Sequence, residues 1–269
     1  MRKQSAPMIV SITSGKGGVG KSVIALNLTE RAGSIGLRTL VIDLNSGIGN
    51  LHLMANIAPR FGVEQYLSRA MRLESSAVGI APNCDLLARV QTGPMAQFSE
   101  TAFQQQFCDQ LRIDAAIYDL VIVDHASGMS EGSTTIAAHS DCSLLVVNPE
   151  LTSIADCYGL YKYLTEQYNR SDNRILINRA KSVDDAEYLG SRLVEMAQSF
   201  LRRSPQIAGT IYEHEDIRQA VTAQKTIAAQ SAQSVALQQI EQIAERFSAE
   251  ISSRRESSDR PVTPPSDNK

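Results

Sequence analysis

The stretch Gly15-Lys16-Gly17-Gly18-Val19-Gly20-Lys21-Ser22 decides how this 269-residue chain folds. Its spacing is G-x-x-x-x-G-K-S, and the glycines let backbone N–H groups approach an anion that a Cβ would obstruct. An apolar run at residues 8–12 precedes the stretch, and a helical pattern over residues 22–36 follows it. This order predicts a P-loop, in which the loop amides and the helix N-terminus bind phosphate.

Five further short runs of β-branched and aliphatic residues have the length of strands, and longer amphipathic segments separate them. These runs cover residues 39–43, 120–124, 143–147, 174–178 and 207–211. Near-continuous apolar strands that alternate with helices predict a parallel sheet with helices on both faces. Because such crossovers are right-handed, we expect an α/β fold with one doubly wound, mostly parallel sheet.

Polar side chains stand where several of these strands end. Asp43, Asp124 and Asn178 close three of the runs, and the P-loop follows a fourth. In doubly wound sheets, ligands bind beyond the carboxyl ends of the strands. We therefore expect Lys21 to reach the β- and γ-phosphates of ATP or ADP, and the Ser22 hydroxyl to ligate Mg²⁺. Asp43 and Asp124 are the candidate carboxylates for this metal, directly or through water.

The composition is that of an ordinary globular protein, with 43% hydrophobic and 20% charged residues. The formal net charge of -3 gives no sign of a general polyanion binder. No apolar run reaches about 18 residues and the N-terminus lacks the anatomy of a signal peptide, so we expect a cytoplasmic protein. Cys84, Cys108, Cys142 and Cys157 form no C-x-x-C pair, which predicts buried thiols.

Apolar residues between positions 235 and 251 recur with helical spacing and predict a final amphipathic helix. We expect this helix to dock on the sheet. The alternative is peripheral contact with a membrane, although its polar face is not the basic one that such helices favour. Residues 252–269 are rich in serine, proline and charge, which predicts a disordered tail. The expected organisation is one domain over residues 1–251 followed by that tail.

Lys16 adds a second lysine to the phosphate-binding loop. With it, residues 16–22 resemble the deviant Walker A motif of the MinD/ParA family. The resemblance implies a P-loop NTPase of the SIMIBI type, in which this lysine reaches across an ATP-dependent homodimer to the partner's nucleotide. It also implies that the whole loop binds nucleotide, and that Lys16, Lys21, Asn45 and Asp124 carry an ATPase reaction.

Further segments extend the similarity over residues 8–247. Residues 39–50 look like the family's first switch segment, switch I, and residues 118–128 look like its Walker B strand and second switch, switch II. Residues 148–156 resemble the N-P-E-x-T-S-x-x-D stretch of the MinD branch. The resemblance makes Glu150 a candidate nucleotide contact.

The resemblance also indicates which residues contact the adenine base and what kind of protein partner binds. Asn178 occupies the place of an adenine contact, and Tyr212 stands where a proline near adenine is common. The T-S-I-x-D-x-Y-x-L-x-K pattern at residues 152–162 and the R-Q-A-V ending at residues 218–221 are most similar to the flagellar-number regulators called FlhG, FleN or YlxH. This similarity implies a protein partner such as a flagellar GTPase or regulator.

Three departures from the family pattern leave alternatives open. Asn45 stands where switch I usually carries an Asp that positions the attacking water. An amide can hold a water but cannot remove its proton, so slow hydrolysis and a nucleotide-binding scaffold without turnover are both considered. His125 replaces a Thr or Ser, either as a local hydrogen-bonding substitute or as a sign of altered switching. The residues before Met8 lack the D-Q-A-x-x-L-R segment that flagellar members often carry.

Two other functions need features that the sequence lacks. An iron–sulfur carrier needs paired cysteines at an interface, and no cysteine follows Asp124 closely. Binding of DNA needs a basic face, and Arg179, Arg202 and Arg203 are too few to predict one. The sequence therefore favours a nucleotide-dependent dimerisation switch without a strong nucleic-acid signal.

Overall fold

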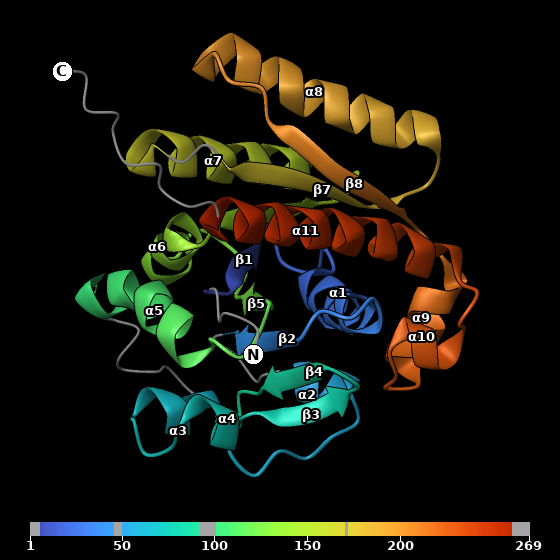
Figure 1. Ribbon diagram of the computed structural model, residues 1–269. Coiled ribbons are helices and arrows are strands. Elements are labelled where there is room, and N and C mark those ends of the chain that lie inside the picture. Colours follow the sequence, from blue (N-terminus) through green and yellow to red (C-terminus); the bar gives the residue numbers. More distant parts are fainter. Residues whose placement is uncertain (1–5, 46–49, 92–100, 170–171, 260–269) are drawn as a thin grey trace, which may run out of the picture.

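Figure 1 shows the computed structural model, which describes residues 6–45, 50–91, 101–169 and 172–259. Within these residues, an eight-stranded sheet has the order β3-β4-β2-β5-β1-β6-β7-β8. In this part of the chain only β3 runs antiparallel to its neighbour β4, and the other adjacent strands are parallel. The strands are β1 (Met8–Thr13), β2 (Thr39–Leu44), β3 (Val78–Ala81), β4 (Cys84–Leu87), β5 (Leu120–His125), β6 (Cys142–Val147), β7 (Asn173–Ala180) and β8 (Gln206–Tyr212).

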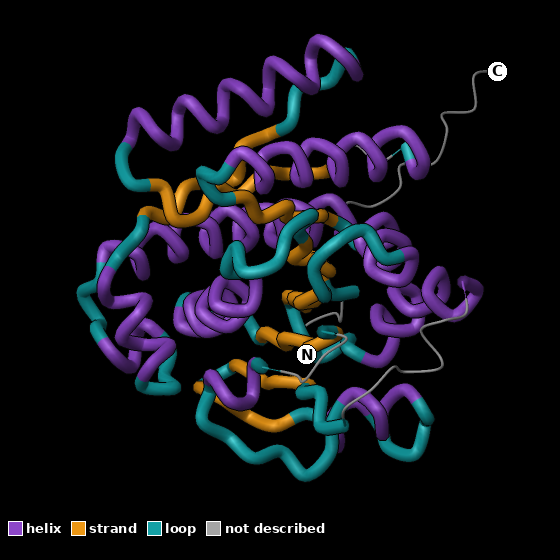
Figure 2. Tube along the Cα trace, turned by 180° about the vertical axis from the view of Figure 1, so that it is seen from behind, coloured by secondary structure: helices purple, strands orange, loops and turns teal. Residues whose placement is uncertain are grey.

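The helices cover both faces of this sheet, as Figures 1 and 2 show from opposite sides. One face is packed by α1 and α11. The other face is packed by α3, α5 and α6 near β2 and by α7 and α8 near β7. The predicted fold class is therefore confirmed. The helices are α1 (Lys21–Ser34), α2 (Leu51–Met54), α3 (Val63–Leu67), α4 (Leu73–Ser76), α5 (Thr101–Asp114), α6 (Glu131–His139), α7 (Leu151–Tyr168), α8 (Val183–Leu201), α9 (Glu215–Thr222), α10 (Ile227–Gln230) and α11 (Val235–Asp259).

The strand β1 shows how the sheet divides the core. Met8, Val10 and Ile12 pack into the cluster that contains residues of α1 and α11, whereas Ile9 packs with α5 and α6. All four side chains are buried. Alternate residues of a strand point to opposite faces, so a continuous apolar run is what a strand covered on both faces requires.

β1 is also the strand at which the winding of the sheet reverses. It pairs with β5 on one side and with β6 on the other, through Ser11↔Val123 and Ser11↔Ser143. A crevice forms at such a point beyond the carboxyl ends of the strands. The P-loop leaves β1 at this point.

The edge formed by β3 and β4 was not predicted from the sequence. These strands have four residues each, and Asp85 interrupts the apolar run of β4. Asp85 is accommodated because its Oδ2 accepts a hydrogen bond from the Tyr118 hydroxyl at 2.7 Å. A short edge strand with partly exposed side chains gives little periodic signal.

The terminal helix docks on the sheet, as predicted, but it continues past residue 251. Eight residues that were expected to begin a disordered tail, 252–259, form its last turns. Arg254 pairs with Asp141 at 3.1 Å, and Arg255 pairs with Asp119. These long-range ion pairs stabilise a segment whose composition alone predicts disorder. Residues 260–269 lie outside the described part of the chain.

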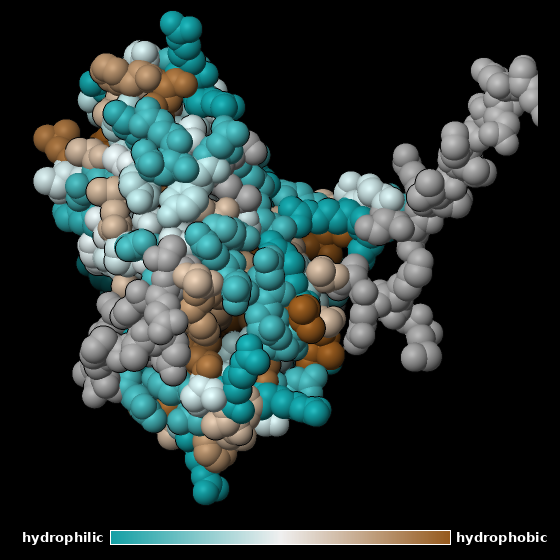
Figure 3. Space-filling model, turned by 90° about the vertical axis from the view of Figure 1, so that its left-hand side faces the viewer, coloured by the Kyte–Doolittle hydropathy of each residue, from teal (hydrophilic) through white to brown (hydrophobic). Residues whose placement is uncertain are grey.

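Among the described helices, none is long and apolar enough to cross a bilayer. On the face seen in Figure 3, apolar side chains form small groups between polar ones.

Candidate functional site

Glycines shape the loop between β1 and α1. Gly18 and Gly20 have φ angles of +75° and +100°, which favour glycine because an L side chain is strained there. A Cβ on Gly20 would lie 2.3 Å from Nδ2 of Asn178, and one on Gly15 would lie 2.4 Å from the carbonyl oxygen of Asp156. The backbone of this loop therefore packs closely against its neighbours. The first N–H groups of α1 follow the loop directly, and such groups at a helix N-terminus bind anions.

Lys21 is buried at the N-terminus of α1, with 6% of its surface exposed. Its Nζ donates hydrogen bonds to the hydroxyls of Ser14 at 2.9 Å and Ser127 at 2.8 Å. Burial lowers the pKa of Lys21, and the nearby Asp124 opposes that shift. Both direct partners are neutral, and an ammonium has three protons to donate. A phosphate oxygen would supply the third acceptor and the counter-charge.

Ser22 and Asp124 form the acidic side of the site. The Ser22 hydroxyl donates to Oδ2 of Asp124 at 2.6 Å. The other carboxylate oxygen, Oδ1, is buried and has no hydrogen-bond partner among the described residues. Burial raises the pKa of Asp124, and the neighbouring Asp43 raises it further. A hydroxyl beside an unsatisfied carboxylate oxygen fits Mg²⁺, which binds oxygen ligands and retains waters.

Asp43 lies beside Asp124 in the paired ends of β2 and β5. Its carboxylate accepts hydrogen bonds from the backbone N–H groups of Asn45 at 3.1 Å and Leu51 at 3.2 Å. Burial raises the pKa of Asp43, while these amides lower it. The carboxylate thus binds the backbone on either side of residues 46–49. Residues 46–49, which were predicted to belong to switch I, lie outside the described residues.

Lys16 and Glu150 are brought together although 134 positions separate them. The Lys16 ammonium donates to the Glu150 carboxylate and, at 2.8 Å, to the hydroxyl of Thr152. The second Glu150 oxygen accepts from Nδ2 of Asn148 at 2.6 Å. The hydrogen bond from Lys16 lowers the pKa of Glu150. In this structure the second lysine of the loop is therefore engaged by its own chain.

The two residues predicted near adenine have different surroundings. Asn178 is buried and donates from Nδ2 to the carbonyl oxygen of Val19 at 2.7 Å, so it supports the P-loop directly. The Tyr212 backbone N–H donates to Oε1 of Gln239 at 3.0 Å. Its side chain packs against the apolar cluster between β7 and α8. Asn178 therefore contacts the loop, whereas Tyr212 belongs to the neighbouring strand β8.

The P-loop lies within a much longer similarity to known proteins. Residues 10–257 match the family described as the CobQ/CobB/MinD/ParA nucleotide binding domain. This chain belongs to that family. The resemblance to MinD and ParA that the loop indicated is thereby confirmed.

Curated relatives of this MinD/ParA-family domain include regulators of flagella and of division. The antiactivator FleN of Pseudomonas aeruginosa is 26% identical over 220 residues, which are 81% of this chain and 78% of FleN. The flagellum site-determining protein YlxH of Helicobacter pylori is 25% identical over 191 residues, 71% of this chain and 64% of YlxH. The septum site-determining protein MinD of Bacillus subtilis is 25% identical over 177 residues, 64% of this chain and 65% of that MinD.

Solved structures agree with the fold. MinD of Aquifex aeolicus has a TM-score of 0.71 at 23% identity, and the match covers 90% of this chain and 97% of that one. MinD of Pyrococcus horikoshii, solved with Mg-ADP, has a TM-score of 0.73 at 19% identity and covers 93% of this chain and 98% of that one. These likenesses establish the architecture of the domain.

Several polar residues of the MinD/ParA-family site were not singled out from the sequence. Ser14 and Ser127 hold Lys21, and Thr152 holds Lys16. Ser127 and Thr152 stand inside segments that resemble the family's motifs, but hydroxyls are common there and carry no specific signal. Gly128 connects the two loops, because its N–H donates to the Ser14 carbonyl oxygen at 2.9 Å.

His125 of this MinD/ParA-family domain is part of the core. Its Nε2 lies 2.9 Å from the Ser11 hydroxyl, which lies 2.7 Å from the hydroxyl of Ser140. Burial lowers the pKa of His125 to about 3, so the imidazole is neutral. These contacts favour the local hydrogen-bonding substitute over altered switching. The thiol of Cys108 lies beside this series of hydrogen bonds, 3.8 Å from the Ser140 hydroxyl. All four cysteines are buried, as predicted.

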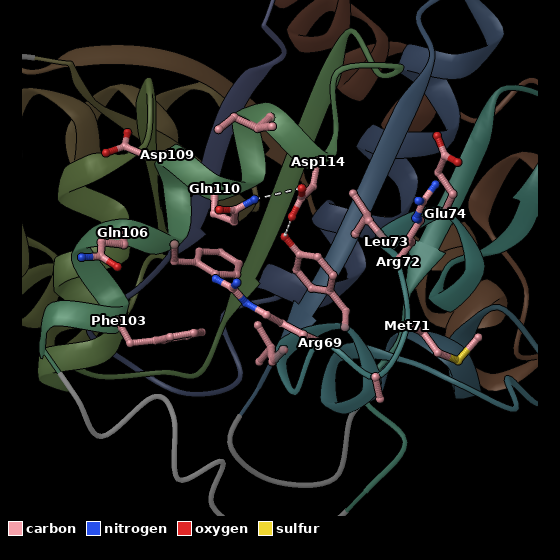
Figure 4. A pocket seen from close by; sticks show the side chains of 15 residues that line it. Arg69, Met71, Arg72, Leu73, Glu74, Phe103, Gln106, Asp109, Gln110 and Asp114 are labelled. Carbon is pink, nitrogen blue, oxygen red and sulfur yellow. Dashed lines mark hydrogen bonds between the residues drawn. The ribbon is translucent and has the colours of Figure 1, made fainter.

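A groove of about 840 Å³ lies away from the P-loop, between the α3–α4 region and α5. Figure 4 shows the Asp114 carboxylate, which accepts hydrogen bonds from Tyr66 at 2.9 Å and from Gln110 at 2.9 Å. Arg69 extends across the groove in the same view. None of the predicted site residues lines this groove.

Proposed function

We propose that the protein is an ATP-dependent dimerisation switch that binds Mg-ATP and hydrolyses it slowly. The observation that carries the proposal is that the site holds both a buried Lys21, hydrogen-bonded to two hydroxyls, and a buried Asp124 oxygen without a partner among the described residues, beside Ser22. A buried ammonium held by two neutral hydroxyls, near a buried carboxylate oxygen that has no partner among the described residues, matches a triphosphate and its metal.

The proposed roles follow from these positions. The loop amides from Gly15 to Ser22 and the Lys21 ammonium would bind the phosphates, and Ser22 and Asp124 would hold Mg²⁺. Asp43 would act on the metal through water while it organises switch I. Bound Mg²⁺ would neutralise phosphate charge during transfer, a reaction that depends mostly on positioning and electrostatics.

The contacts of Lys16 favour a switch over a static site. Reaching a partner's nucleotide would require this lysine to leave Glu150 and Thr152. The γ-phosphate of ATP would compete for the same ammonium, and ADP offers no such group. The difference between the two nucleotides would then decide whether two subunits close around them.

The second candidate is a nucleotide-binding scaffold with little or no turnover. Asn45 favours it, because the amide cannot accept the proton of an attacking water. ATP would then stabilise the dimer by mass action alone.

Phosphate release by the wild type, Asn45→Asp and Lys16→Ala separates the two candidates, with the oligomeric state followed by light scattering. The switch predicts slow release that Asn45→Asp accelerates and Lys16→Ala abolishes, together with an ATP-dependent dimer in the wild type. The scaffold predicts the same dimer without release. If the wild type and Lys16→Ala release phosphate at the same substantial rate, the proposed mechanism does not apply.

The cellular role is proposed from the relatives. FleN is named an antiactivator, YlxH is named a flagellum site-determining protein, and MinD is named a septum site-determining protein. We propose regulation of the number or placement of a structure such as the flagellum, through a flagellar GTPase or regulator. Such a protein would work in the cytoplasm, and ATP-dependent sedimentation with liposomes would detect peripheral membrane contact.

A further inference from the structure

Arg89 is a buried arginine two residues after the end of β4, and only 2% of its surface is exposed. An arginine at such a site is costly to bury unless acceptors and a counter-charge satisfy its guanidinium. No family motif in the sequence includes it. Its partners therefore indicate why the position carries an arginine.

Those partners join three separate segments. The Arg89 Nη1 donates to the carbonyl oxygen of Asn45 at 2.6 Å, and Nε donates to the carbonyl oxygen of Gln91 at 3.2 Å. The carboxylate of Glu64, on α3, lies 3.8 Å from Nε and supplies the counter-charge. Glu64 is fixed in turn, because it accepts from the backbone N–H groups of Gln91 at 3.0 Å and Val90 at 3.3 Å.

The contact with Asn45 is made within switch I, directly after the end of β2. The Asn45 N–H donates to Asp43, and the Asn45 carbonyl oxygen accepts from Arg89. The peptide groups on both sides of this residue are thus held by buried charged side chains. Fixing both groups fixes the backbone at Asn45 and hence the direction in which its side chain leaves the chain.

We propose that Arg89, held by Glu64, is a positioning residue for switch I, which orients Asn45 toward the γ-phosphate side of the nucleotide. This inference rests on the proposed function. Arginine suits the role because its planar guanidinium reaches two carbonyl oxygens and a carboxylate at fixed angles. A lysine offers only a point charge on a flexible stem. The expected signature is selective, because switch segments respond to the γ-phosphate that ADP lacks.

The test is calorimetry of Mg-ATP and Mg-ADP with the wild type, Arg89→Met and Arg89→Lys. Because Arg89→Met loses a hydrogen bond from a charged group to the Asn45 backbone, we expect Mg-ATP binding to weaken by at least about tenfold. Binding of Mg-ADP should change less than about twofold, and Arg89→Lys should be intermediate. Hydrogen exchange of the backbone N–H groups of Asn45 and Leu51, which donate to Asp43, should accelerate in Arg89→Met.

The matched control is Arg174→Met. Arg174 is also buried and pairs with Glu250 at 2.6 Å, but it lies at the start of β7, away from the carboxyl ends of the strands. This control should lower stability and leave the ratio of the two affinities unchanged. If Arg89→Met behaves like the control, Arg89 is only structural and the inference is overturned.

Two further outcomes are decisive. If Arg89→Met does not fold, the same calorimetry is carried out with Arg89→Lys and Glu64→Gln. An unchanged ratio of the Mg-ATP and Mg-ADP affinities in both variants overturns the inference. If the folded wild type binds neither nucleotide, the proposed function fails first, and the inference fails with it. A wild type that binds both nucleotides separates the two cases.

Discussion

Replacing Gly20 with alanine tests how closely the P-loop is held by the strand beside it. Gly20 has a φ of +100°, and an added Cβ would lie 2.3 Å from Nδ2 of Asn178. The side chain of Asn178 would have to rotate, which breaks its 2.7 Å hydrogen bond to the Val19 carbonyl oxygen. Because Asn178 is buried, the broken bond leaves polar groups without partners.

The magnitude follows from these two effects. Backbone strain at positive φ costs about 1–2 kcal/mol, and the reduced entropy of the unfolded chain offsets about 0.4–1 kcal/mol of it. An unsatisfied buried donor or acceptor adds about 1–3 kcal/mol. We therefore expect Gly20→Ala to lower the free energy of unfolding by about 2–4 kcal/mol.

Gly36→Ala is the control for strain without a close contact. Gly36 has a φ of +95°, and a Cβ there would meet no atom within 4 Å. Its expected cost is about 1 kcal/mol. Urea unfolding without nucleotide, followed by circular dichroism, measures both variants. In an Asn178→Ala background, the cost of Gly20→Ala should fall to that of Gly36→Ala, because the obstructing side chain is gone.

Two results would refute this reasoning. Equal costs for Gly20→Ala and Gly36→Ala would mean that Asn178 does not press on the loop. An extra cost that survives in the Asn178→Ala background would mean that the strain comes from the loop backbone alone.

The remaining predictions concern the end of α11 and the buried thiols. Arg255→Ala removes the ion pair with Asp119, so it should destabilise the protein by about 1 kcal/mol and speed hydrogen exchange in the last turns of α11. The control is Arg192→Ala at an exposed position, which should have neither effect. Unchanged hydrogen exchange in Arg255→Ala would contradict the view that this ion pair anchors the end of α11. Burial raises the pKa of Cys108 to about 11 and that of Cys157 to about 12. At pH 8 these native thiols should react with a disulfide reagent at least about 100-fold more slowly than in guanidinium, and equal rates would contradict their burial.

The sequence was sufficient wherever the physical constraint is local. The glycines of residues 15–20 predicted the P-loop because only glycine reaches the required backbone angles and approach distances. Five-residue apolar runs predicted the parallel strands because a strand covered on both faces has no polar side. The order of these signals along the chain was enough to predict a doubly wound sheet, and the carboxyl ends of the strands indicated where the candidate site lies.

Tertiary structure alone decided which polar groups meet. The Lys16 ammonium contacts a carboxylate 134 positions away, and Arg255 pairs with Asp119 across 136 positions. Neither residue of such a pair constrains which residues stand next to it in the sequence, so no sequence spacing predicts the contact. The same holds for Arg89 and Asn45, whose hydrogen bond exists because β4 and β2 lie side by side in the sheet. Long-range polar pairing depends on the assembled sheet, and a local pattern cannot encode it.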